Sequence, residues 1–143
     1  MIFENEIFAI DRNMECAIPG YLVLRLKGGE TSLAELSPEK AEALGVLLAR
    51  AARAIEAAVG AERVYVLSFC EVDRRLHFHL FPRSAWLLKE YHKANFNANE
   101  AIDGPMLFSW ARSVFGPGSH IPKGMSDAAA AGAAIRSILE VKE

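Results

Sequence analysis

The stretch His77-Phe78-His79-Leu80-Phe81-Pro82-Arg83 decides how this sequence is interpreted. Apolar and polar side chains alternate along it, which is typical of a β-strand with one buried face. Because side chains two positions apart share a face of a strand, we expect a functional face that reaches back to residue 75. Its members are Arg75, His77, His79, Phe81 and Arg83. Two imidazoles flanked by two guanidinium groups form a site suited to an anion, and phosphate is the obvious candidate.

The composition of the whole chain limits the classes of protein to consider. The chain has 143 residues, of which 52% are apolar and 24% charged, so we expect one globular domain with its own core. The formal net charge of −2 argues against non-specific binding to nucleic acid. Because we find neither a signal peptide nor an apolar run long enough for a bilayer, we expect a cytoplasmic protein without a membrane partner. Cys16 and Cys70 are too few for a disulfide framework.

Local signals predict one long helix over residues 37–59. Ser37 is a suitable N-cap, Pro38 suits the first helical position, and Glu39 complements the positive end of the helix dipole. Apolar residues recur at helical spacing as far as Val59, and Gly60 is a typical residue to end a helix.

Shorter elements are expected around this helix. Strands are predicted over residues 7–10, 21–27 and 63–72, with a turn at Pro19-Gly20 and a hairpin turn at Asp73-Arg74 leading into the histidine strand. After residue 83 the pattern becomes helical, with helices predicted from Ser84, over 106–115 and after Ser126-Asp127, separated by loops at 95–103 and 116–124.

Residues 2–83 resemble the core of the histidine triad (HIT) superfamily. The resemblance is carried by four stretches in the family's order, which are Ile7-Phe8-Ala9-Ile10-Asp11, Ile18-Pro19-Gly20-Tyr21-Leu22-Val23, Ser32-Leu33-Ala34-Glu35-Leu36-Ser37-Pro38-Glu39 and Leu76-His77-Phe78-His79-Leu80-Phe81-Pro82-Arg83. It implies an α+β fold, with an antiparallel sheet of about five strands and one long packed helix, to which the helical pattern after residue 83 adds C-terminal helices. We expect a single HIT-like domain over residues 1–143, with a core at 2–85 and a C-terminal helical extension at 86–143.

The resemblance also implies roles for individual residues. His77 aligns with the family's nucleophilic histidine and His79 with its third histidine, while Arg75 replaces the first histidine. Tyr21 stands after the Pro-Gly turn, where many members carry a histidine. We expect His77 and His79 to be catalytic and Arg75 and Arg83 to bind phosphate.

A nucleoside site is expected at the first of the four stretches. By resemblance, Asp11 would accept hydrogen bonds from the ribose hydroxyls, and Phe8 and Ile10 could form an apolar slot for the base.

These residues imply an enzyme of the HIT hydrolase type that needs no cofactor. It would be a nucleotide hydrolase or nucleotidyl transferase, acting at the α-phosphate of a dinucleoside polyphosphate or nucleoside phosphoramidate through a covalent His77 intermediate. Its partners would be the nucleotide conjugate and a second copy of the chain, with residues 37–59 and 63–72 as contact elements. Two alternatives remain open: a nucleotide-binding protein of the same fold with little or no turnover, and a small metal-binding protein that uses His77 and His79.

Overall fold

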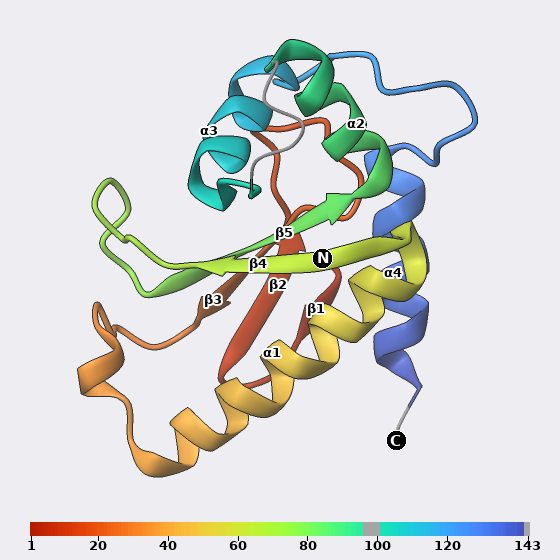
Figure 1. Cartoon of the computed structure of the whole chain (residues 1–143). Helices are drawn as coiled ribbons and strands as arrows, with labels where there is room; N and C mark the ends of the chain where they lie inside the picture. Colours follow the sequence, from red (N-terminus) through yellow and green to blue (C-terminus); the bar gives the residue numbers. More distant parts are fainter. Residues whose placement is uncertain (96–100, 142–143) are drawn as a thin grey trace.

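A five-stranded antiparallel sheet forms the centre of the computed structural model, which describes residues 1–95 and 101–141 (Figure 1). The strand order is β1-β2-β3-β5-β4. The strands are β1 (Phe3–Glu4), β2 (Phe8–Arg12), β3 (Leu22–Leu26), β4 (Ala61–Leu67) and β5 (His77–Ser84). The helices are the 3-10 turn η1 (Leu33–Glu35), α1 (Pro38–Val59), α2 (Ala85–Ala94), α3 (Gly104–Val114) and α4 (Ala128–Glu140). The predicted α+β fold with about five strands is confirmed.

Helix α1 begins and ends where its local signals predict. The Ser37 hydroxyl accepts a hydrogen bond from the backbone N–H of Lys40, and Pro38 occupies the first helical position. At the other end Gly60 adopts φ +64°, the left-handed conformation that ends many helices. One side of α1 is buried against the sheet through Leu44, Leu47, Ala51, Ala54 and Ile55.

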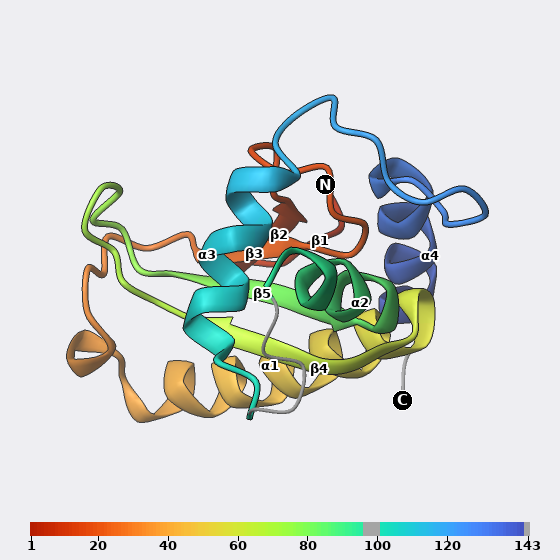
Figure 2. The same cartoon turned by 45° about the horizontal axis from the view of Figure 1, so that its top comes forward.

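The sheet is covered on both faces, as Figure 1 shows, with α1 and α4 on one side and α2 and α3 on the other. The first face carries the main core, in which strand residues such as Leu24, Phe78 and Leu80 pack against α1 and against Ile135 of α4. The second face carries an aromatic cluster that includes Tyr21, Phe81 and Phe108. Figure 2 shows α2 and α3 lying over β5 on this second face.

Two predicted boundaries in the histidine hairpin are wrong. Strand β4 ends at Leu67, not at residue 72, and β5 begins at His77, so a loop over 68–76 replaces the expected tight turn at Asp73-Arg74. The ladder breaks because Cys70 has a positive φ of 54° and the Ser68 hydroxyl bonds to the His77 carbonyl, 2.7 Å away. Arg75 therefore lies in this loop and outside the strand.

Two of the remaining local predictions are confirmed, and one strand was not expected. The Pro19-Gly20 turn is confirmed, with Gly20 at φ +86°, and Asp127 caps α4 by accepting from the N–H of Ala130. The sequence did not predict β1, which pairs Phe3 with Ile10. Part of the predicted loop 95–103, namely residues 96–100, lies outside the described residues. Within residues 1–95 and 101–141, no helix is long and apolar enough to cross a membrane.

Candidate functional site

The strand register brings three of the predicted site residues onto one face of the sheet. Asp11 on β2 is opposite Val23 on β3, and Val23 is opposite His79 on β5, so Asp11, Val23 and His79 form a row across the sheet. In the next row, Arg25 on β3 is opposite His77. Because neighbouring strands lie about 4.8 Å apart, Asp11 and His79 are separated by roughly 10 Å, enough for a ribose and a phosphate between them.

A cleft opens over these rows. Its walls include Asp11 and the turn after β2, Arg25 on β3, residues of the 68–76 loop, His77 and His79 on β5, and Arg112 on α3. Residues from both ends of the chain therefore meet around the two histidines.

His77 is held in a single orientation by its own backbone neighbourhood. Its Nδ1 lies 2.7 Å from the carbonyl oxygen of Arg75, two residues earlier. A carbonyl oxygen can only accept, so in the neutral ring Nδ1 carries the proton and Nε2 keeps a free lone pair. The Cys70 sulfur lies 3.6 Å from the same Nδ1. The geometry matches the requirement for an imidazole nucleophile, a fixed tautomer with an unprotonated nitrogen.

His79 contacts a tyrosine on its inner side. Its Nδ1 lies 2.7 Å from the hydroxyl of Tyr21, and its ring centroid lies 5.3 Å from that of His77. Burial lowers the pKa of His79 to about 4, and the nearby Arg112 charge acts in the same direction. His79 is therefore neutral at pH 7. Burial also raises the pKa of Tyr21 far above its usual value, so its hydroxyl stays protonated.

The structure does not bring the two predicted phosphate-binding arginines to the cleft. Arg75 is 70% exposed and binds Asp73 through two nitrogens, Nε at 3.0 Å and Nη2 at 2.7 Å. This pairing holds the pKa of the Asp73 carboxyl well below its usual range. Arg83 lies beyond Phe81 on β5 and pairs with Glu62 on β4, 2.9 Å away.

Two other arginines, Arg25 and Arg112, line the cleft instead. Arg25 is next to His77 across the β3–β5 ladder, and its position as the polar residue in an apolar strand is a signal that the sequence contains. Arg112 pairs with Glu15 at 2.8 Å and lies 5.4 Å from the centre of the Phe108 ring. No local signal identifies Arg112, because its placement depends on how α3 packs on the sheet.

Only one of the three residues predicted to bind the nucleoside lines the cleft. Asp11 lines the cleft, where its Oδ1 also lies 3.1 Å from the amino group of Met1. Phe8 and Ile10 are 1% and 0% exposed and belong to the core under α1, on the opposite face of the sheet. These two side chains therefore cannot contact a ligand that lies beside the histidines.

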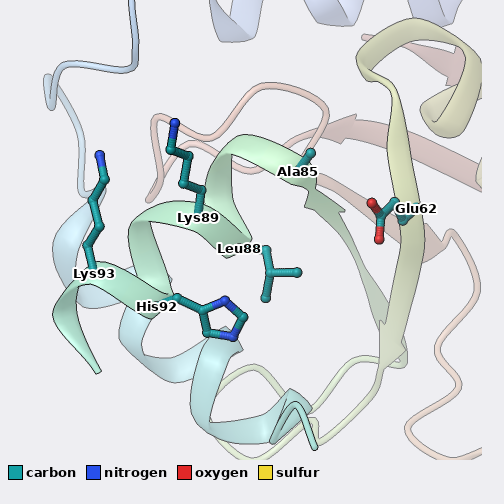
Figure 3. Close-up of a pocket in the computed structure, with 6 residues that line it drawn as sticks. All are labelled: Glu62, Ala85, Leu88, Lys89, His92 and Lys93. Carbon is teal, nitrogen blue, oxygen red and sulfur yellow. The ribbon is translucent and has the colours of Figure 1, made fainter. Parts of the chain in front are cut away.

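A second pocket, which shares no lining residue with the cleft, lies between α2 and Glu62 on β4 (Figure 3). It contains none of the predicted site residues. Figure 3 shows the His92 ring beside Leu88, while Lys89 and Lys93 extend outward from the helix. In the described part of the chain, no group of three or more His, Cys, Asp or Glu side chains is placed to hold a metal ion.

The fold and the cleft define a class: an α+β protein with two neighbouring histidines on the central part of an antiparallel sheet and a carboxylate two strands away. Comparison with solved structures places this architecture among histidine triad proteins. A hypothetical histidine triad nucleotide-binding protein from Sulfolobus tokodaii is similar, with a TM-score of 0.61 and 17% identity over 97% of this chain and 82% of the other.

Two further structures agree. A histidine triad protein from Bradyrhizobium japonicum has a TM-score of 0.62 and 13% identity over 95% of this chain and 87% of its own. A Zn-bound histidine triad family protein from Mycobacterium smegmatis has a TM-score of 0.57 and 18% identity over 96% and 81%. Neither a family model nor a curated protein sequence matches the chain. The chain has the histidine triad fold, and the predicted resemblance is confirmed at that level.

Proposed function

We propose that this protein is a HIT-type nucleotide hydrolase or nucleotidyl transferase that acts at the α-phosphate of a nucleotide conjugate through His77. The observation that carries the proposal is the bond between His77 Nδ1 and the Arg75 carbonyl, which leaves Nε2 as a free nucleophile at the cleft. One similarly folded protein, from Sulfolobus tokodaii, is described as a hypothetical histidine triad nucleotide-binding protein, which supports the same assignment.

The reaction would proceed in two displacements. In the first, Nε2 of His77 forms a bond to the α-phosphorus, and the bond to the leaving group breaks with its electron pair on the departing atom. In the second, the oxygen of a water molecule bonds to the phosphorus and gives up a proton to solvent. The phosphorus–Nε2 bond breaks at the same time, and its electron pair stays on Nε2. A different acceptor in place of water would make the enzyme a transferase.

The charged residues of the cleft fit this scheme. Arg25 and Arg112 supply positive charge for the phosphate oxygens, and Asp11 can accept from the ribose hydroxyls. Arg75 would reach the phosphate only after it releases Asp73. Arg83 does not line the cleft and pairs with Glu62, so we assign the phosphate role to Arg25 and Arg112 instead.

A homodimer is part of the proposal. Strand β4 is an edge of the sheet, and Val66 on it is 46% exposed. Val46, on the outer side of α1, is 61% exposed. An isologous contact through these two elements would cover both side chains and the free strand edge.

The covalent intermediate is the direct test. A dinucleoside polyphosphate or a nucleoside phosphoramidate should add one nucleotidyl group to the protein, located at His77 by mass spectrometry after a rapid neutral quench. His77→Ala should abolish both the adduct and the turnover, whereas His92→Ala, at the second pocket, should leave both unchanged. Turnover that survives His77→Ala would contradict the proposal.

A binding protein without turnover is the second candidate, because a guanidinium replaces the family's first imidazole and is engaged by Asp73. In that case AMP would bind and no adduct would form. Asp11→Asn separates a nucleotide site from a bare phosphate site. It should weaken AMP binding by roughly tenfold, the effect of losing a charged hydrogen-bond acceptor, and leave inorganic phosphate binding unchanged.

A further inference from the structure

Tyr21 is buried next to His79, and the contact between its hydroxyl and the His79 ring sets the direction of a hydrogen bond. Its ring packs edge-on against Phe81 and Phe108, with centroids 5.3 and 6.3 Å away. The side chain is 2% exposed, and within the described residues His79 Nδ1 is the only hydrogen-bond partner of its hydroxyl. The Tyr21 side of this contact is therefore almost wholly removed from solvent.

The proton in this contact must belong to the tyrosine. A buried O–H without an acceptor is costly, whereas an unused oxygen lone pair costs little. If His79 Nδ1 carried the proton and donated to Tyr21, the phenol hydrogen would have no acceptor. Tyr21 therefore donates to Nδ1, and the ring proton of His79 lies on Nε2.

The two imidazoles then have opposite tautomers. His77 offers an unprotonated Nε2, because its proton is on Nδ1 beside the Arg75 carbonyl. His79 offers an N–H at Nε2, because its Nδ1 accepts from Tyr21. With ring centroids 5.3 Å apart, one ring can attack a phosphorus while the other donates a hydrogen bond to an oxygen of the same phosphate.

We propose that Tyr21 is a positioning residue that holds His79 as a hydrogen-bond donor but prevents it from acting as a proton donor, so that the site favours leaving groups that depart as anions. This inference rests on the proposed function. If His79 gave up its Nε2 proton, it would become an imidazolate unless Nδ1 took the proton of Tyr21, which would leave a buried phenolate. A phenolate is unfavourable in the apolar aromatic cluster around Tyr21, and an imidazolate is unfavourable because a neutral imidazole gives up its remaining proton with great difficulty.

The bonds that form and break in each reaction predict a preference between two substrate classes. In an anhydride, the His77–phosphorus bond forms while the bridging P–O bond breaks, and the leaving phosphate keeps the electron pair without needing a proton. In a phosphoramidate, the departing nitrogen must gain a proton, which His79 cannot provide and solvent must supply. We therefore expect dinucleoside polyphosphates to react faster than nucleoside phosphoramidates.

The cations around His79 act in the same direction, whereas the Glu15 carboxylate opposes them. The groups that face it are Arg112 from α3, His77 on its own strand, Glu15 from the turn after β2 and Arg25 from β3. Burial and the Arg112 charge keep its pKa near 4, so the protonated form is scarce at neutral pH. Arg112 is also placed to stabilise an anionic leaving group once it exchanges Glu15 for phosphate.

Tyr21→Phe tests the inference, because it removes one oxygen and keeps the aromatic packing. Nitrogen-15 NMR of the histidine rings should show His79 protonated at Nε2 in the native protein and a mixture of tautomers in the variant. The turnover number for a dinucleoside polyphosphate should fall by about tenfold with KM little changed, as expected when a donor is misplaced. Tyr65→Phe is the matched control, since Tyr65 stacks on the same Phe81 ring and should leave both readouts unaltered.

The possible outcomes separate this inference from the function on which it rests. A native His79 protonated at Nδ1, or a Tyr21→Phe variant with unchanged tautomer and turnover, would overturn the role of Tyr21. Faster turnover of the phosphoramidate, with a normal His77 adduct, would overturn the leaving-group preference alone. The absence of turnover and adduct with both substrates would overturn the proposed enzyme and the preference together, while the NMR result would still decide whether Tyr21 positions His79.

Discussion

The buried histidine predicts a loss of stability in mild acid. In the unfolded chain a histidine titrates near its usual pKa of 6.5, whereas in the folded protein burial lowers the pKa of His79 to about 4. Between these values the unfolded state binds a proton that the folded state does not, so stability falls as the pH decreases from 7 to 4. At about 1.36 kcal/mol for each pH unit, the full effect is about 3 kcal/mol. Because the imidazole is only partly buried, solvent screening reduces this, and we expect about 1–3 kcal/mol.

Urea denaturation at several pH values between 4 and 8 measures this effect. His79→Gln removes the titrating group, so the free energy of unfolding of the native protein minus that of the variant should decrease steadily toward acid pH. His120→Gln serves as the control, because it deletes an exposed histidine from the 116–124 loop and leaves the cleft intact. Its difference from the native protein should show no comparable slope.

Parallel curves for the native protein and His79→Gln would refute the reasoning. They would mean that the folded protein binds a proton at His79 as readily as the unfolded chain does. A slope of the opposite sign would be equally decisive, since it would require a folded-state pKa above 6.5, which the buried position beside Tyr21 and Arg112 does not allow.

Further predictions concern the turn, the cleft, metal ions and assembly. Gly20→Ala should destabilise the fold by about 1–3 kcal/mol in thermal unfolding, because φ is +86° and the new Cβ would lie 3.0 Å from Val59, whereas Gly29→Ala, with open space around it, should not. Arg112→Ala should raise KM for a dinucleoside polyphosphate by roughly tenfold, the effect of losing a charged hydrogen bond, while Arg136→Ala, on the exposed side of α4, should not change it. A chelator should leave turnover unaltered, and inhibition would favour the metal-binding alternative. Light scattering across a dilution series should give twice the 15.7 kDa of one chain, and a constant monomer mass would refute the dimer.

Local chemistry explains which parts of the fold could be predicted. The bounds of α1 follow from Ser37, Pro38 and Gly60, each of which acts within a few residues of its own position. The ends of β4 and β5 depend instead on the positive φ of Cys70 and on the Ser68 bond to the His77 carbonyl. Neither feature has a local sequence signal, and the alternating apolar pattern continues past the point where the ladder stops.

The candidate site shows the same limit. His77, His79 and Asp11 were identified from short motifs, and the strand register places all three at one cleft. Arg112 could not be found, because its position depends on a helix far away in sequence. The slot proposed from Phe8 and Ile10 conflicted with the two-residue period of a strand, since residues at even positions cannot share a face with Asp11.

The location of Arg112 on α3 has a consequence for how this site could change in evolution. In the proposed reaction, the tautomer of His77 is fixed by the Arg75 carbonyl in the loop before β5, while Arg112 comes from α3. Substitutions in α3 can therefore alter which leaving group is accepted without disturbing the attacking nitrogen. Descendants of such a chain could diverge in substrate choice through a single helix while inheriting the same chemical step.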